Sequence, residues 1–299
     1  MTRNLILVTG APRTATTPVG NMLETAKNTV SLYEPLGPTG LKRFQDWFPM
    51  KGEGGAEDLS VLFDDLRRFK SGGLKSQQRG KSFSLKRAVF GSRTIHSYRK
   101  AKLSFGVDNV IWKDPHAIFM AADVAAAGIP VVLTIRRAKA HASSYRRLGW
   151  VSKAVELYPR WQQRFGACDV IESYLGEASD SVVSAALLWR MCYLPLVQAG
   201  VVERVHLVSP DDLAVDERGC YESLLAKLDL TETQKTEELL AAKKSDTRSR
   251  PSANTTHDWG RSVSAVNSYW RELLTEEDIH KVDAITADIE QEILGPEAS

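Results

Sequence analysis

Asn4-Leu-Ile-Leu-Val-Thr-Gly-Ala-Pro-Arg-Thr-Ala-Thr-Thr-Pro-Val-Gly-Asn-Met-Leu23 is the stretch that decides the fold of this chain. Its apolar run, residues 5–8, is typical of a strand that is buried on both faces of a sheet. The Gly-Ala-Pro sequence at residues 10–12 ends that strand, and apolar residues from Val19 onward recur at helical spacing. The stretch therefore predicts a strand, a tight loop and a helix.

The loop between this strand and helix has the features of an anion-binding site. Such a loop directs successive backbone N–H groups at one point, beside the positive end of the helix dipole. Arg13 adds a full positive charge, and Thr14, Thr16 and Thr17 add hydroxyl donors. We therefore predict a cradle for a phosphate or a sulfate group.

Two common nucleotide-binding loops do not fit this sequence. The P-loop pattern G-x-x-x-x-G-K-[ST] fails because Gly10 is followed at the second glycine position by Ala15, with no lysine after it. The dinucleotide pattern fails because Gly10 and Gly20 stand alone. The pattern that remains is Pro-basic-small-small-Thr-Thr. Residues Pro12–Thr17 resemble the 5′-phosphosulfate loop of sulfotransferases that use 3′-phosphoadenosine 5′-phosphosulfate (PAPS), although that family more often has Ser-Gly where this chain has Thr-Ala.

A second anion motif follows another predicted strand. Residues 130–135 read as a central parallel strand, and Arg136 comes directly after it, at the edge of the sheet where ligands bind. The next helix begins near Ala138 and carries Ser144 about two turns along, so that Arg136 and Ser144 can converge on one phosphate. The stretch from Arg136 to Tyr145 resembles the 3′-phosphate motif of the same family, without the usual proline after the arginine.

The resemblance implies an α/β fold, a three-layer sandwich with a central parallel sheet of the P-loop NTPase-like sulfotransferase type. It is strongest over residues 4–36 and 110–145, weaker over 181–294 and absent over 41–109. We therefore predict a single sulfotransferase domain over residues 1–299, with a basic insertion at about 41–109 whose structure the pattern does not resolve.

Two candidate catalytic residues stand at predicted strand ends. Glu34 precedes Pro35, which ends a short strand, and Lys113 ends the strand that begins at Val110. Spacing alone favours a solvated glutamate at a strand end for Glu34, and for Lys113 the alternative is an ordinary exposed lysine. The family resemblance implies that Glu34 is the base for the acceptor hydroxyl and that Lys113 reaches the bridging or sulfonyl oxygens.

The identity of the base stays open between three residues. A carboxylate or an imidazole within hydrogen-bond reach is the ordinary means of removing the proton. Related small-molecule enzymes place a histidine two residues after the strand lysine, and in this chain Pro115 takes that position. His116 and Asp114 flank it and are the alternatives to Glu34.

The reaction that the resemblance implies moves a sulfuryl group from PAPS to an acceptor hydroxyl and leaves 3′-phosphoadenosine 5′-phosphate (PAP). The protein then contributes mainly positioning and charge neutralisation, as in phosphoryl transfer. Arg136 and Ser144 would hold the 3′-phosphate, and Arg13 would also stabilise the leaving phosphate. The 5′-phosphosulfate would be held by the loop residues Arg13, Thr14, Ala15, Thr16 and Thr17. No metal is expected, because no ligand cluster of H-x-x-x-H type appears.

The composition is that of a globular protein with mild overall charge. The chain has 299 residues, 43% of them hydrophobic, a formal net charge of +2 and a pI near 8.3, which does not favour a nucleic-acid partner. No apolar run reaches the length of a membrane span, and the first strand begins close to Met1, so we predict a cytoplasmic protein without a transmembrane segment. The three cysteines show no C-x-x-C spacing and predict neither a disulfide framework nor a zinc site.

One stretch of the chain is much more positively charged than the overall net charge indicates. The stretch from Leu66 to Val107 contains no Asp or Glu, while twelve Lys or Arg lie between Arg67 and Lys102. This bias indicates either a polyanion-binding surface or a solvated insertion. It favours an anionic or extended acceptor, such as a polysaccharide or a glycolipid. Tryptophans that could stack on sugar rings, although each alone is more typical of a core, are Trp47, Trp112, Trp150 and Trp161.

Two other functions fit parts of the sequence. A P-loop-type kinase would need ATP, magnesium and a loop lysine that is missing. A non-catalytic polyanion-binding protein on the same fold would bind through residues 67–102 in a salt-dependent way. Related sulfotransferases close a loop over the nucleotide in the region of Lys243 to Val263. The arginines of this region, to none of which we assign a contact, are Arg248, Arg250 and Arg261.

Overall fold

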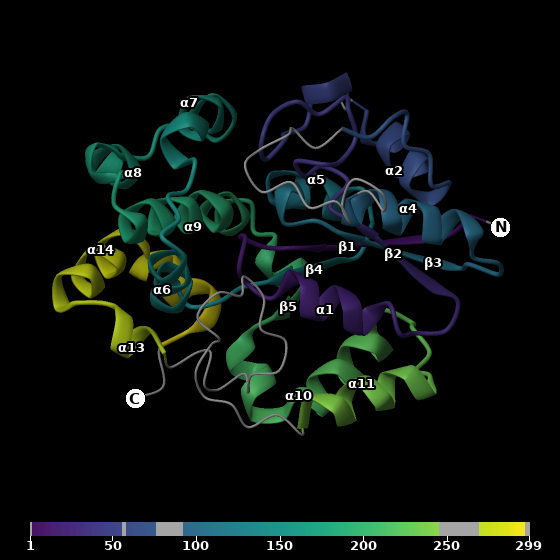
Figure 1. The fold of residues 1–299 in the computed structure, drawn as a ribbon. Helices are drawn as coiled ribbons and strands as arrows, with labels where there is room; N and C mark the ends of the chain where they lie inside the picture. Colours follow the sequence, from purple (N-terminus) through teal and green to yellow (C-terminus); the bar gives the residue numbers. More distant parts are fainter. Residues whose placement is uncertain (1, 56–57, 76–91, 245–268, 297–299) are drawn as a thin grey trace. The chain divides into compact units, whose positions relative to one another are not determined.

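A five-stranded sheet with all strands parallel forms the centre of the protein, and helices flank it. The computed structural model describes residues 2–55, 58–75, 92–244 and 269–296. The strand order is β2-β3-β1-β4-β5 (Figure 1). The strands are β1 (Asn4–Thr9), β2 (Thr29–Tyr33), β3 (Asn109–Lys113), β4 (Val131–Thr134) and β5 (His206–Val208). The prediction of an α/β protein with a central parallel sheet is confirmed.

The chain divides into two compact units. Unit 1 consists of residues 1–134, 205–207 and 221–237, and unit 2 consists of the remaining segments, 135–204, 208–220 and 238–299. The chain passes from unit 1 to unit 2 directly after β4. The residues expected at the two ends of a bound nucleotide therefore fall in different units.

The strand register of unit 1 brings three strand ends to one level. Leu5 to Val8 of β1 are at most 2% exposed, as expected for a strand covered on both faces. Val8 of β1 and Tyr33 of β2 both lie opposite Lys113 of β3. The segments that follow β1, β2 and β3 therefore all begin at the same edge of the sheet.

Helices cover both faces of the sheet in unit 1. Figure 1 shows α1 (Thr16–Leu23) on one face, and on the other face α2 (Leu59–Arg67), α4 (Arg93–Leu103) and α5 (Ala121–Ala126). The predicted helix at residues 117–127 is divided, because a 3₁₀ turn, η2 (Pro115–Met120), precedes α5. Asp114 caps this turn by accepting the backbone N–H of His116.

Unit 2 is helical, and α9 (Ser181–Gln198) forms its core. Helices α6 (Ala138–Leu148) and α14 (Glu276–Leu294) pack against α9 (Figure 1). Among the described residues, α9 is also the helix whose length and hydropathy would suit a membrane span. However, 83% of it is buried within the protein, as is usual for the central helix of a helical core.

The remaining helices and turns complete the two units. In unit 2, Arg190 of α9 donates two hydrogen bonds to Asp288 of α14, at 2.6 and 2.9 Å. The other helices are α7 (Ala154–Phe165), α8 (Asp169–Tyr174), α10 (Pro210–Lys227), α11 (Gln234–Lys244) and α13 (Trp270–Leu273). The other 3₁₀ turns are η1 (Glu53–Gly55), η3 (Leu175–Glu177) and η4 (Val202–Arg204).

Candidate functional site

The loop between β1 and α1 contains two residues in the left-handed region of backbone space. Arg13 has φ 77° and Ala15 has φ 73°, one on each side of Thr14. Left-handed residues in a loop turn successive N–H groups toward one side and make a concave site for an anion. A non-glycine residue held in this conformation costs about 1–2 kcal/mol, and such strain concentrates at functional sites. The loop therefore has the backbone of the predicted anion cradle.

Three hydroxyl contacts lie within this loop and between it and the ends of β1 and β4. Thr14 Oγ1 donates to the Ala11 carbonyl at 2.6 Å and lies 3.0 Å from Oγ1 of Thr134, the last residue of β4. The Thr134 hydroxyl in turn donates to the carbonyl of Thr9 at 3.1 Å. Both threonines are fully buried. The structure thus gives the Thr14 side chain a role inside the loop, where it holds the cradle in shape.

The Ala15→Gly variant is expected to be more stable than the wild type by about 0.5–1 kcal/mol, because glycine adopts the left-handed conformation without the Cβ clash. The greater freedom of glycine in the unfolded chain reduces the gain. Chemical denaturation measures the difference. Ala127→Gly is the control, because Ala127 is exposed and has φ −79°, so glycine should destabilise there. A loss of similar size in both variants would contradict the left-handed conformation of Ala15.

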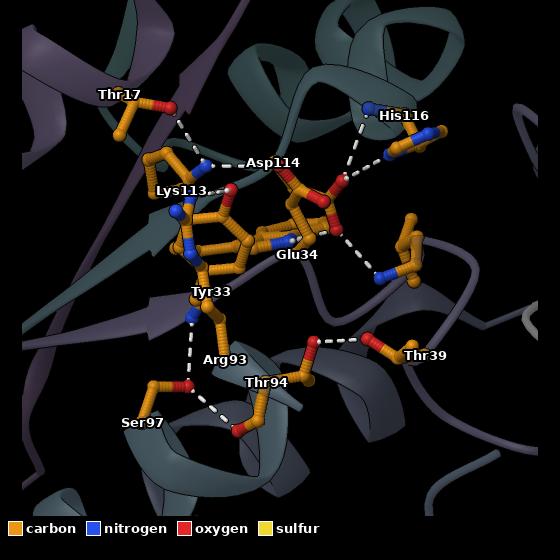
Figure 2. Close-up of polar contacts among 12 residues, drawn as sticks. Thr17, Tyr33, Glu34, Thr39, Arg93, Thr94, Ser97, Lys113, Asp114 and His116 are labelled. Carbon is orange, nitrogen blue, oxygen red and sulfur yellow. Dashed lines mark hydrogen bonds and ion pairs between the residues drawn. The ribbon is translucent and has the colours of Figure 1, made fainter. Parts of the chain in front are cut away.

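The ammonium group of Lys113 is the centre of the candidate site (Figure 2). The Lys113 side chain is 2% exposed, and its Nζ donates to Thr17 Oγ1 at 3.2 Å and lies 3.0 Å from Glu34 Oε1. The same Nζ stands 3.5 Å from the centre of the Tyr33 ring. A buried ammonium is tolerated only when partners of this kind replace its water. The structure therefore joins three residues that the sequence placed separately: Thr17, Glu34 and Lys113.

Gly20 provides the space through which the lysine reaches this point. It lies inside α1, where glycine costs about 1 kcal/mol relative to alanine. A Cβ at this position would lie 2.5 Å from Cγ of Lys113. The aliphatic stem of Lys113 thus crosses α1 at Gly20, and its Nζ lies beside Thr17, one turn nearer the start of the helix.

Glu34 is the more accessible member of the ion pair. Its side chain is 21% exposed, against 2% for Lys113. Its backbone N–H donates to the Lys113 carbonyl at 2.8 Å, and its φ of 47° is again left-handed. A strained backbone that holds a carboxylate at the edge of the sheet fits a functional rather than a structural residue.

Lys75, which lies far along the chain, contacts the turn after Glu34. The backbone N–H of Gly37 donates to the Glu34 carbonyl at 3.0 Å, and Lys75 Nζ donates to the Gly37 carbonyl at 3.2 Å. Burial lowers the pKa of Lys75, and the attraction of the Asp114 carboxylate opposes this shift. Lys75 therefore adds a second amino group to this region, on the side of the Glu34 turn.

The buried Asp114 carboxylate links several segments of the site through hydrogen bonds. Asp114 is fully buried, and its Oδ2 accepts from the Leu36 N–H at 2.5 Å and from Trp112 Nε1 at 3.4 Å. Its Oδ1 accepts the His116 N–H at 3.0 Å and lies 3.3 Å from His116 Nδ1. These contacts tie the end of β3 to the turn after β2 and orient the imidazole. Asp114 is thus enclosed by donors of the protein itself.

His116 lies on the other side of the Glu34 turn. It is 6% exposed, and its ring centre stands 5.4 Å from that of Trp47 and 5.2 Å from that of Phe48. A Cβ on Gly37 would lie 3.0 Å from Cβ of Glu34 and 3.3 Å from Nδ1 of His116. The two other candidates for the base, Glu34 and His116, therefore border the same glycine.

The residues predicted to hold the 3′-phosphate belong to unit 2. Arg136 is 8% exposed, and its carbonyl accepts the indole N–H of Trp189 at 2.8 Å. Ser144 lies on α6 and is 7% exposed. Arg13 and the other residues predicted to hold the 5′-phosphosulfate belong to unit 1, as do Glu34 and Lys113.

The structure also bears on the predictions about the tryptophans, a metal site and the basic stretch. Of the four tryptophans, Trp112 and Trp161 are core residues, whereas Trp47 is 44% and Trp150 is 41% exposed. Among the described residues, no group of three or more His, Cys, Asp or Glu could hold a metal ion. The central part of the basic stretch, residues 76–91, lies outside the described residues. The loop arginines outside them are Arg248, Arg250 and Arg261.

Three residues of the site were not predicted from the sequence. Tyr33 places its ring against the ammonium group, Gly20 opens space for the lysine, and Thr134 supports the loop. Two of them leave a local signal: a threonine near the end of an otherwise apolar strand, and a glycine inside a helix, which often marks a close approach of another segment. The Tyr33 contact leaves no such signal.

No family model, no curated protein and no solved structure matches this chain. A function is therefore inferred from the contacts themselves. A loop with two left-handed residues, a buried ammonium group and an accessible carboxylate meet at one edge of the sheet. These are the groups needed to transfer an anionic group from a phosphorylated donor to a hydroxyl.

Proposed function

We propose that this protein is a cytoplasmic sulfotransferase that moves a sulfuryl group from PAPS to a hydroxyl of a carbohydrate, a polysaccharide or a glycolipid. One observation carries the proposal. The buried Lys113 ammonium touches both the Thr17 hydroxyl, at the start of α1, and the Glu34 carboxylate. It therefore connects the side that would hold the donor with the side that would receive the acceptor.

The donor side consists of the loop before α1. Its backbone N–H groups and the Arg13 guanidinium would hold the 5′-phosphosulfate, and Thr16 and Thr17 would add hydroxyl donors. Negative charge grows on the leaving phosphate as the S–O bond breaks. The Lys113 ammonium, placed beside Thr17, would neutralise that charge in a site from which water is largely excluded.

The acceptor side centres on Glu34. The acceptor oxygen would attack sulfur as the bond from sulfur to the PAP oxygen breaks, and the hydroxyl proton would pass to the Glu34 carboxylate. Glu34 is favoured over Asp114 because it is accessible, whereas Asp114 is enclosed by four contacts. His116, oriented by Asp114, is the alternative base.

The 3′-phosphate is the second anionic group of the donor that the protein would hold. Arg136 and Ser144 would bind the 3′-phosphate and so set the position of PAPS along its length. These two residues take no part in the chemistry. Their substitution therefore tests the identity of the cofactor independently of the reacting groups.

The first test of the proposal is a calorimetric titration of the full-length protein with PAP, with ATP and magnesium as the comparison ligand. We expect micromolar binding of PAP, weakened by about 10-fold or more in Arg13→Ala and in Arg136→Ala, because each removes a charge-assisted contact to a phosphate. Arg204→Ala is the matched control. Arg204 is exposed, and its guanidinium donates to the carbonyls of Ala199 and Gly200.

Three outcomes would count against the proposal. Binding of ATP with magnesium but not of PAP would favour a kinase. Binding of heparin without any binding of PAP would favour a polyanion-binding protein. PAP binding that is equal in Arg13→Ala, Arg136→Ala and Arg204→Ala would remove both proposed phosphate contacts.

A further inference from the structure

Two large apolar side chains project into solvent where α4 ends. Leu103, the last residue of α4, is 77% exposed, and Phe105, in the turn that follows, is 98% exposed. Single exposed apolar residues are ordinary, but here two stand within one turn of each other. A phenylalanine that is almost wholly exposed contributes nothing to the core of unit 1. Its position therefore calls for an apolar partner outside the protein.

The exposed side of α4 is rich in basic residues. The buried stripe of the helix, which faces the sheet, consists of Thr94, Ser97, Tyr98 and Ala101. The exposed cations are Arg93, Arg99, Lys100 and Lys102. Lys100 pairs with Glu24, and Arg93 donates to the Tyr33 hydroxyl at 3.3 Å. Within the described part of the chain, the side chains of Arg99 and Lys102 form no hydrogen bond or ion pair and are exposed, so their charges face solvent.

More positive charge lies next to the turn. Arg3 donates from Nε to the Val107 carbonyl at 3.2 Å and from Nη1 to the Arg67 carbonyl at 2.8 Å, so it joins the turn to the end of α2. The acidic groups beside these cations are Glu24, which pairs with Lys100, and Asp108, whose carboxylate accepts from the Asn28 side chain at 2.8 Å. Positive groups thus outnumber negative ones around Leu103 and Phe105.

This surface lies away from the candidate site. The turn leads into the first residue of β3, Asn109, whereas Lys113 is the last residue of that strand. The four residue steps of this strand separate the two by about 13 Å. Figure 1 shows the turn between α4 and β3 at the outer end of the strands of unit 1. A partner bound here would leave Glu34 and the loop before α1 open.

We propose that the end of α4 and the following turn form a peripheral binding surface for anionic lipid bilayers. Leu103 and Phe105 enter the boundary between headgroups and acyl chains, and Arg99 and Lys102 contact lipid phosphates. The positive charge of this surface favours an anionic partner. The two apolar side chains favour a lipid bilayer over a soluble polyanion, because a soluble polyanion has no apolar interior in which they could be buried.

The test is sedimentation of the full-length protein with lipid vesicles at about 0.1 M salt. The vesicles are phosphatidylcholine alone and phosphatidylcholine with about one third phosphatidylserine. We expect binding to the anionic vesicles, weak binding to the neutral ones, and a loss of binding at about 0.5 M salt. Phe105→Ser should weaken binding about 10-fold or more through the lost apolar burial, and Lys102→Glu by at least about 5-fold.

The matched control is Val215→Ser, because Val215 is an apolar residue that is 89% exposed in unit 2 and should not affect binding. Thermal unfolding confirms that each variant is folded, and it is expected to stay at the wild-type value because these side chains are exposed. The proposal is overturned if the wild type fails to sediment with anionic vesicles, or if Phe105→Ser binds as well as the wild type.

A third outcome also overturns it. Heparin, used as a soluble polyanion, could bind the wild type and Phe105→Ser equally while neither protein binds vesicles. The surface would then be a polyanion site without a membrane role. The vesicle experiment does not depend on the proposed reaction, because it contains no nucleotide, and PAP binding is measured separately.

Discussion

The Gly10→Ala variant is expected to be less stable than the wild type by about 3 kcal/mol or more, through overpacking and broken hydrogen bonds. A Cβ on Gly10 would lie 2.1 Å from the Thr134 carbonyl oxygen, 2.4 Å from its Oγ1 and 2.7 Å from Oγ1 of Thr14. These atoms belong to backbone and to buried hydroxyls, so they can move only if the contacts among Thr9, Thr14 and Thr134 break.

Urea unfolding followed by circular dichroism measures this loss. Gly176→Ala is the matched control, because a Cβ there meets no atom within 4 Å, and its stability should stay within about 0.5 kcal/mol of the wild type. Under the proposed function, Gly10→Ala also weakens PAP binding, because the loop loses its shape. Equal unfolding midpoints for Gly10→Ala and the wild type would show that the loop does not pack against β4 in this way.

The Lys113→Met variant is expected to lose about 2 kcal/mol of stability and roughly 10²–10³-fold in sulfuryl transfer. Methionine keeps an unbranched stem past Gly20 but removes the ammonium group, which leaves the Glu34 carboxylate without its partner. The expected loss is smaller than for a fully buried pair, because Glu34 is 21% exposed. Denaturation gives the stability, and release of PAP from PAPS in the presence of acceptor gives the transfer rate.

A double-mutant cycle separates the ion pair from the effects of the individual side chains. Glu34→Gln in the Lys113→Met background should recover part of the stability, because no unpaired charge remains, with a coupling of about 1–2 kcal/mol. The control cycle uses Lys153→Met and Glu156→Gln, an exposed pair at 2.7 Å with side chains 45% and 70% exposed. Its coupling should be no more than about 0.5 kcal/mol. Equal coupling in the two cycles would contradict the buried environment of Lys113.

Local signals in the sequence were enough to predict the class of the fold. β1, β3 and β4 are short apolar runs, each followed by a polar or glycine-containing turn, because strands buried on both faces need apolar residues at every position. The loop and helix after β1 were predicted for the same kind of reason. Gly10 and Pro12 break the strand, and the residues after Thr16 have helical spacing.

Helix α4 shows where such signals are insufficient. Its buried stripe consists of Thr94, Ser97, Tyr98 and Ala101, which are small or polar except for the tyrosine. Hydrophobic periodicity therefore does not identify it, and the basic residues on its other side read as a solvated insertion. The helix forms because its small residues let it lie close against β2, a contact that depends on the folded sheet.

The sequence by itself determined that Glu34 and Lys113 stand at strand ends and that a tight loop and a helix follow β1, because a strand end is a local property of the chain. The tertiary structure alone decided that Lys113 contacts Glu34 and Thr17, that Thr14 turns its hydroxyl into the loop, and that Gly20 gives the lysine its path. These contacts depend on the order and register of parallel strands, which are set by packing between segments far apart in the sequence.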